Sequence, residues 1–369
     1  MNYREYFDGE IRDMVVYLRN EDIDEKIIND MVDSGYVCYN DMIFDTFYGF
    51  NLYNTRTIGI NEIKYYQQNR KWESFYPRQK KIYIVNDIDE IYSIVDRLNI
   101  GNDKILFRGA TSIYMFRRAF PSPVYSDKNG NEISMVPSYF RKYSNNYMER
   151  RDLEEFCRFL NSFFENLYYE KFYKLVNSYK NNEISFEKYC DEAEDFKEEL
   201  DKDTLDFIDL STIVQHYSYE SNVLDVTYNI EIALFFALNK LVSVVKNYYD
   251  YIPLEKKEYK NAVIYILSPQ TVLNDVNQWK YNYFTIKNLD CVRPIRQECT
   301  SLPANIDNIN IAASEIRAII KFSENFKLPV IMPQKEYLFP SAKEDPFYAY
   351  LLNNNKIKKK VMRFKFHDG

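Results

Sequence analysis

Three short, nearly continuous apolar runs limit the folds open to this chain more than any other feature. IYIVND begins at residue 82, ILFRG at 105 and AVIYILSP at 262. Runs of this length followed by turn residues predict β-strands, the last two of them buried. The second run ends in Arg108 and Gly109, so a buried strand is expected to deliver a charged side chain at its end. Gly109 has no Cβ and lets backbone or a ligand approach closely.

Helical periodicity surrounds these predicted strands. Apolar residues recur at helical spacing in two short stretches of residues 1–35. They recur again after Asp87 and Asp89, either of which is suited to cap a helix. A further apolar helix is predicted from Ile230 to Val245, and an amphipathic helix over residues 311–326.

The most highly charged part of the chain is also helical in period. Because its charge density needs a solvated face, this block is predicted to form a helical insertion at about 150–209, packed beside a sheet and not through it. Residues 1–80 are predicted to be an N-terminal helical and loop-rich segment of unknown role, with short strands between 36 and 80. The remainder, 81–369, is predicted to be one domain that ends in an alternating strand over 359–367.

Composition excludes several classes of function. The 369 residues carry 48 Lys and Arg against 55 Asp and Glu, and a formal charge of −7 gives no general attraction to a nucleic-acid backbone. The 8 glycines form no phosphate-binding loop, and 2 histidines cannot build the usual metal-binding helix, so no metal site is predicted. The 5 scattered cysteines fit a reducing cytoplasm, and no stretch of ~18 apolar residues predicts a membrane span.

A few polar positions are candidates for chemistry. His216 lies in VQHY, shortly before LDVT, where Asp225 and Thr227 share one side of an extended segment. A lone histidine is more often structural than functional, and Asp225 or Thr227 is suited to cap the following helix, although Asn229 is an equally good cap. Arg108 needs a carboxylate or phosphate because its charge cannot be titrated away. A fixed ion pair with Asp225 is its structural alternative.

Three separated stretches together resemble the FRG domain family: LFRGATSIY at 106–114, QHYSYESNVLDVTYNIEIALFFA at 215–237 and RPIRQECTS at 293–301. The family is named for a Phe-Arg-Gly tripeptide, which here is Phe107, Arg108 and Gly109. Its central signature joins Gln-His-Tyr to Leu-Asp-x-Thr and then to Ala-Leu-x-Phe-Ala. This chain satisfies it in order with Gln215, His216, Tyr217, Leu224, Asp225, Thr227, Ala233, Leu234, Phe236 and Ala237. Arg293 and Gln297 resemble the late Arg-x-x-x-Gln element, whereas Cys299 and Ser301 replace the usual Gly and Phe.

The resemblance implies a fold and a ligand. FRG domains look like distant relatives of the ADP-ribosyltransferases. This resemblance implies an α+β fold with a split antiparallel sheet and flanking helices, and NAD as the bound substrate. Carried over to this chain, the resemblance implies an NAD pocket in which Arg108 holds the phosphates or ribose. The expected binding residues are Arg108, Gly109, Gln215, His216 and Thr227.

The resemblance also implies a catalytic set of Arg108, Asp225, Thr227 and a late polar residue. Cleavage of the glycosidic bond of NAD passes through a cation-like ribose, which a nearby carboxylate stabilises. Gln297 or Glu298 takes the place of the transferases' catalytic glutamate. Neighbours on one strand face opposite sides, so only one of the two is expected to enter the pocket. The resemblance points to Gln297, with Asp225 assisting.

Two functions from different classes are consistent with these expectations. The first is an NAD-dependent ADP-ribosyltransferase or NAD-cleaving enzyme acting on an unknown macromolecular acceptor, as bacterial toxins and antiphage defence effectors do. The alternative is a catalytically silent FRG module that binds a nucleotide or a protein partner. The substitutions at Cys299 and Ser301 lie around the expected pocket and bear on the activity more than on the fold, and the fold alone does not choose between the two functions because a fold hosts many functions.

Overall fold

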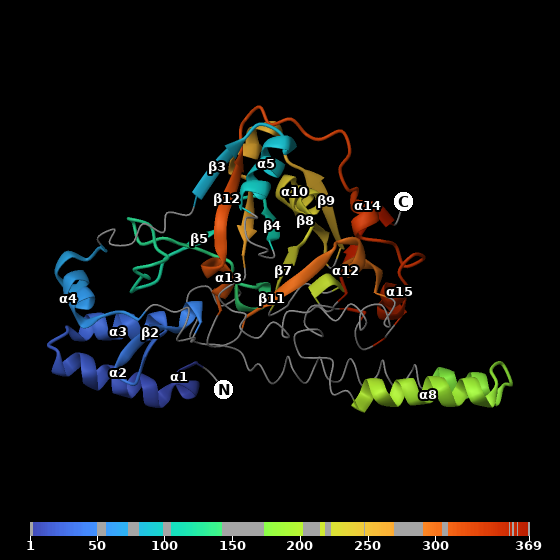
Figure 1. Ribbon diagram of the computed structural model, residues 1–369, viewed down its shortest axis with the longest axis horizontal. Helices are drawn as coiled ribbons and strands as arrows, with labels where there is room; N and C mark the ends of the chain where they lie inside the picture. The colour runs from blue at the N-terminus through green and yellow to red at the C-terminus, as the bar shows by residue number, and fades with distance from the viewer. Residues whose placement is uncertain are drawn as a thin grey trace.

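The chain has a mixed α+β architecture, with several sheets and many helices (Figure 1). This computed structural model describes residues 3–49, 57–72, 81–98, 105–141, 173–201, 215–217, 223–246, 248–268, 291–304, 309–353, 355, 358–359 and 361–367. Its largest element is a six-stranded sheet in the order β11-β7-β4-β10-β12-β3. The strands are β11 (Cys299–Pro303), β7 (Val223–Thr227), β4 (Leu106–Ala110), β10 (Val263–Leu267), β12 (Ile316–Phe322) and β3 (Lys81–Val85).

The three apolar runs form strands of this sheet, as the sequence predicts. β4 and β10 lie at its centre, and every residue of β10 is buried. β3 lies at the edge, where it pairs in parallel with β12 and leaves Ile82 and Ile84 exposed. The buried runs are therefore covered on both faces, while the edge run is not.

The sheet is narrowly joined between β4 and β7. β4 shares five pairs with β10, and β7 shares five with β11, but β4 and β7 meet in the single pair Phe107–Thr227. All three pairings are antiparallel. The sheet therefore consists of a β11-β7 part and a β4-β10-β12-β3 part that share a single strand pair.

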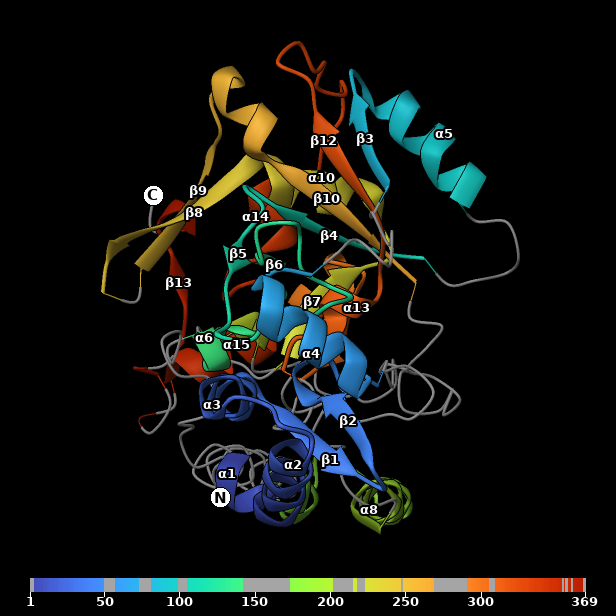
Figure 2. The same cartoon turned by 90° about the vertical axis from the view of Figure 1, so that its left-hand side faces the viewer.

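One face of the sheet is covered by α10 (Ile230–Leu238) and by α5 (Ile88–Leu98), which lies beside β3 and β12 in Figure 2. Asp87 caps α5 as expected, since its Oδ1 accepts a hydrogen bond from Glu90 N at 3.0 Å. α10 is apolar on all sides because the sheet covers one side and a second aromatic cluster covers the other.

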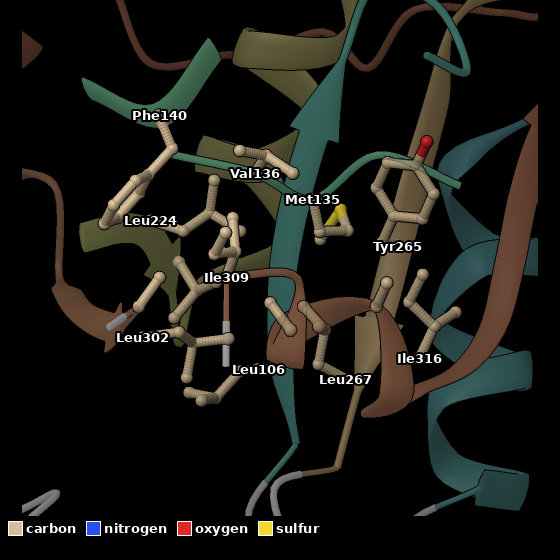
Figure 3. Close-up of a cluster of buried hydrophobic side chains, with 14 of the residues drawn as sticks. Leu106, Met135, Val136, Phe140, Leu224, Tyr265, Leu267, Leu302, Ile309 and Ile316 are labelled. Carbon is tan, nitrogen blue, oxygen red and sulfur yellow. The ribbon is translucent and has the colours of Figure 1, made fainter. Parts of the chain in front are cut away.

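The opposite face carries a second part of the core. Figure 3 shows side chains from β4, β7, β10 and β11 gathered with Met135 and Val136, which come from the segment before α6 (Ser138–Arg141). The hydroxyl of Tyr265 points away from the aliphatic side chains. This face therefore has an apolar interior and one polar group directed out of it.

The predicted helix from Ile230 to Val245 is wrong beyond Leu238. Asn239–Val245 form β8, which pairs with β9 (Tyr248–Pro253) and, through β9, with β13 (Arg363–Phe364). The residues LVSVV are mostly β-branched, and a partner strand is available in space, so extended backbone is favoured there. The predicted final strand over 359–367 is reduced to β13 and the 3-10 turn η3 (Lys365–His367).

The predicted helix over 311–326 is also wrong. Only α13 (Ile311–Ser314) is helical, and β12 begins at Ile316. β12 runs between β10 and β3 with apolar layers on both faces, so five of its seven residues are apolar and only Arg317 and Lys321 interrupt the run. Such a run resembles a helical pattern in the sequence, and only the strand partners distinguish the two.

The N-terminal segment has a core of its own. As predicted, it contains two amphipathic helices, α2 (Asp8–Asn20) and α3 (Glu25–Ser34), and two short strands, β1 (Tyr36–Tyr39) and β2 (Met42–Asp45). The sequence did not reveal α4 (Ile60–Asn69), which lies in the segment predicted to be loop-rich. The segment also includes α1 (Tyr3–Tyr6) and η1 (Thr46–Tyr48).

A buried charge network joins this segment to the rest of the chain. Arg118 donates to Asp45 Oδ2 at 2.7 Å and to Glu132 Oε2 at 3.0 Å, and it also reaches Ser34 O. Glu132 belongs to the short hairpin β5 (Met115–Phe116) and β6 (Glu132–Ile133). Burial raises the pKa of Glu132. One guanidinium therefore balances two buried carboxylates from different parts of the sequence.

The predicted helical insertion is described only from 173 to 201. Residues 173–180 are helical, and α8 (Phe186–Asp201) comes next; the rest of the predicted block lies outside the described residues. In Figures 1 and 2, α8 lies apart from the six-stranded sheet. Where it is described, the block is helical, as expected from its charge pattern.

Candidate functional site

Most of the predicted site residues meet on one face of β7 and β11. The register places Asp225 opposite Ser301, and Thr227 opposite Cys299. Residues directly opposite in an antiparallel pair share a face, so these side chains point the same way. The turn of helix at 215–217 and the end of α12 (Val292–Arg296) add the other two members. We call this group the β7–β11 cluster: His216, Asp225, Thr227, Gln297, Cys299 and Ser301.

His216 is buried in this cluster and is a neutral imidazole at neutral pH. Its Nε2 lies 2.9 Å from Cys299 Sγ and 3.8 Å from Asp225 Oδ1. Burial lowers the pKa of His216, and this effect outweighs the opposing influence of Asp225. A neutral ring is able to accept a proton from a neighbouring group.

Asp225 is the carboxylate of the β7–β11 cluster. Its side chain is about one quarter exposed, and its Oδ1 accepts a hydrogen bond from Ser301 Oγ at 3.3 Å. Ser301 occupies a position where the family usually differs, yet its hydroxyl contacts the charged group directly. Asp225 is therefore oriented by a neighbour and still accessible from outside.

Thr227 holds the backbone of the cluster in place. Its hydroxyl lies 2.9 Å from Gln297 O and donates to it, and it accepts a hydrogen bond from Asn229 N at 3.1 Å. Asn229 caps α10, because its Oδ1 accepts from Glu231 N. The hydroxyl of Thr227 is therefore engaged in joining β7 to the turn after α12.

Gln297 points inward and Glu298 outward, but not through strand alternation. α12 ends at Arg296, Gln297 continues in a helical conformation, and Glu298 adopts a left-handed φ of 43° before β11 begins. The expectation that both residues lie on a strand is therefore wrong. Gln297 is buried, and its Nε2 donates to Leu338 O at 3.0 Å, whereas Glu298 Oε1 accepts from Asn229 Nδ2 at 2.9 Å.

Arg108 reaches the cluster only through the main chain. Phe107 pairs with Thr227, so by alternation the Arg108 side chain leaves the sheet on the opposite face. It shares that face with Tyr265, its partner on β10. Its Nη1 donates to the carbonyl oxygen of Asp225. Arg108, His216, Asp225, Thr227 and Gln297 were all expected in one pocket, and this expectation is only partly met: four lie in the cluster, and Arg108 contacts it from the other side.

Gly109 has a packing role. A Cβ placed there would lie 1.8 Å from Ala233 O and 2.6 Å from Ala237 N, both main-chain atoms of α10. The backbone that approaches Gly109 closely, as expected at a glycine, is therefore that of α10. Gln215 begins the helical turn that carries His216, and within the described residues its buried Oε1 has no hydrogen-bond partner.

Two features near the site are not evident from the sequence. Arg293 is fully buried, its Nη1 donates to His216 O at 3.2 Å, and its guanidinium lies 3.8 Å from the ring centroid of Tyr348. The sequence places Arg293 in the Arg-x-x-x-Gln element, but it does not indicate that the side chain is buried. The buried hydroxyl of Tyr265 has no hydrogen-bond partner in the part of the chain described, and no sequence pattern indicates this.

Neither a metal centre nor a membrane span is found in the described part of the chain. No cluster of three or more metal-binding side chains occurs among the described residues. In that same part of the chain, no helix has the length and apolar character needed to cross a bilayer.

Comparison with known families identifies the central part of the chain. A family model of the FRG domain matches residues 124–243. The chain contains an FRG domain. The match includes His216, Asp225 and Thr227, but it begins after Arg108 and ends before Gln297. No curated protein and no solved structure matches the chain.

Proposed function

We propose that this FRG-domain protein is an NAD-dependent ADP-ribosyltransferase or an NAD-cleaving enzyme with a transferase-like split sheet. The observation that carries the proposal is the narrow β4–β7 junction. There the two parts of the sheet share one pair, and Arg108 extends from one part to the main chain of Asp225 in the other. A cationic side chain thus stands where two parts of a sheet separate.

Tyr265 supports a ligand on the Arg108 side of the sheet. Leaving a buried hydroxyl without a partner costs on the order of 1–3 kcal/mol. Tyr265 is 2% exposed, and its oxygen is directed away from the apolar side chains around it. A ligand with phosphate or ribose oxygens beside Arg108 would supply the missing partner. In this proposal Arg108 and Tyr265 bind NAD, and Gly109 fixes the strand that carries Arg108.

Asp225 is the proposed catalytic carboxylate. Its side chain and that of Arg108 leave the sheet on opposite faces, so in this proposal NAD held by Arg108 extends past the narrow β4–β7 junction to place its ribose near Asp225. When the bond between ribose C1′ and nicotinamide breaks, the electron pair leaves with neutral nicotinamide, and positive charge develops on the ribose. A fixed anion close to the ribose stabilises this developing charge in the transition state. Water or an acceptor then forms the new bond at C1′ and loses a proton, for which the Asp225 carboxylate is the proposed base. Ser301 orients that carboxylate.

The test is nicotinamide release from NAD by the purified full chain, alone and with cell lysate, measured by mass spectrometry. Asp225→Asn and Arg108→Ala should each lower turnover by about 10²-fold or more while leaving the melting temperature near that of the parent. Glu298→Gln is the matched control, because Glu298 is a carboxylate of the same region that points outward. Turnover that survives both Arg108→Ala and Asp225→Asn would refute the assignment.

A catalytically silent module that binds a nucleotide or protein is the second candidate, favoured by one specific observation. Gln297 presents a neutral amide where the transferases have a catalytic glutamate, and Glu298 points outward. Calorimetric binding of NAD with a dependence on Arg108, but without nicotinamide release, would favour this module over the enzyme.

A further inference from the structure

A second candidate site lies at the end of β4, beyond Gly109. It is a pocket of about 410 Å³, within the range of small-molecule sites. The residues that decide its chemistry are Thr111, Ser112, Lys240, Lys260, Asn261 and Lys321. We call it the β4-end pocket. None of the residues of the β7–β11 cluster lines it.

The β4-end pocket carries an excess of positive charge. Lys260 is paired with Glu324 at 3.2 Å, and Glu258, which also lines the pocket, accepts a hydrogen bond from Glu255 N. Lys240 and Lys321 form no ion pair or hydrogen bond with any of the described residues. Two ammonium groups are thus available to an anion.

Neutral donors complete the lining. Within the described part of the chain, the side chains of Thr111, Ser112 and Asn261 make no hydrogen bond. Two hydroxyls and an amide beside two ammonium groups match the oxygens of a phosphate, which accept several hydrogen bonds at once.

The lysines are mounted on regular structure. Lys321 lies in β12 between β10 and β3, where it pairs with Val263 and Ile84. Lys240 is the second residue of β8, which directly follows α10. Leu254, which lines the pocket, donates its N–H to Leu238 O at 2.8 Å. The backbone positions of both charges are therefore set by the sheet and by the α10–β8 junction.

We propose that the β4-end pocket binds the phosphate or diphosphate group of a small molecule, held between Lys240 and Lys321. A phosphate monoester carries about −1.5 to −2 charge at pH 7, which matches two unpaired ammonium groups. The net charge of −7 opposes binding of an extended polyanion such as nucleic acid, so a compact anion fits better. The proposal is independent of the NAD reaction.

The experiment is isothermal titration of the full chain with inorganic pyrophosphate, ADP and adenosine at about 0.15 M salt, near physiological ionic strength. Pyrophosphate and ADP should bind and adenosine should not. Lys240→Gln and Lys321→Gln should each weaken binding about tenfold, and the double variant about a hundredfold. Lys343→Gln, at an exposed lysine outside the pocket, is the matched control and should bind as the parent does.

Failure of this site and failure of the NAD proposal are separable. Binding of pyrophosphate that depends on Lys240 and Lys321 should persist in the Arg108→Ala variant, because Arg108 does not line the β4-end pocket. The proposal is overturned if neither pyrophosphate nor ADP binds, if adenosine binds as tightly as ADP, or if the double variant binds like the parent. Neither Lys240 nor Lys321 is buried, so their substitution should leave the melting temperature near that of the parent. Thermal melting of each variant checks this, so that a loss of binding is assigned to the lost charge and not to unfolding.

Discussion

Gly109→Ala should be far more damaging than its size suggests. The new Cβ would lie 1.8 Å from Ala233 O and 2.6 Å from Ala237 N. Both atoms belong to the main chain of α10, so no side chain can rotate aside. Real Cβ atoms essentially never approach another heavy atom within 3.0 Å, and α10 would have to move away from β4.

The size of the effect depends on how α10 is held. Seven of its nine residues are buried, so a shift that relieves the contact disturbs packing on both sides of the helix. Overpacking a core by one methyl group costs about 1–3 kcal/mol, and occasionally more. Because main-chain atoms are the obstacle, we expect Gly109→Ala to lower the free energy of unfolding by about 3 kcal/mol or more. This is a large part of the ~5–15 kcal/mol by which a typical protein is stable.

Urea denaturation followed by circular dichroism measures this loss, with Gly9→Ala as the control. Gly9 lies in α2, and its added Cβ meets nothing within 4 Å. Gly9→Ala should therefore be neutral or stabilising by up to ~1 kcal/mol through helix propensity. If Gly109→Ala unfolds within about 0.5 kcal/mol of the parent, the packing account of the tripeptide glycine is wrong.

Two further predictions concern buried ionisable groups. Arg118→Met should destabilise the chain by about 3–5 kcal/mol in urea denaturation, because Asp45 and Glu132 would keep buried carboxylates without their cation; a change below ~1 kcal/mol would contradict this. Burial lowers the pKa of His216 below 6.5, so the unfolded chain binds the proton more readily, and stability should fall as pH drops below about 6.5. His216→Gln should flatten that fall between about pH 7.5 and 5.5, and an unchanged slope would argue against a buried neutral imidazole.

The candidate site was only partly predictable. Asp225 and Thr227 share a face because a two-residue period is a local property of a strand. The same rule misplaced Gln297 and Glu298, because the turn between α12 and β11 was not visible in the sequence. Arg108 was expected beside Thr227, but the register Phe107–Thr227 decides its face, and a register joins residues 120 positions apart.

The sequence by itself determined the elements whose pattern is local. Periodicity and capping chemistry account for the helices α2, α3 and α5, the strands β4 and β10 and the cap at Asp87. The ordered signature from Gln215 to Ala237 indicates the FRG domain.

Tertiary structure decided the rest. β12 is extended because β10 and β3 flank it, and α10 ends at Leu238 because β9 pairs with the residues of β8. The β4-end pocket gathers lysines 81 residues apart, Lys240 and Lys321, through strands whose partners no local pattern specifies. Local backbone preference amounts to a few tenths of a kcal/mol per residue, whereas burial against a partner contributes several times more, so the partner decides.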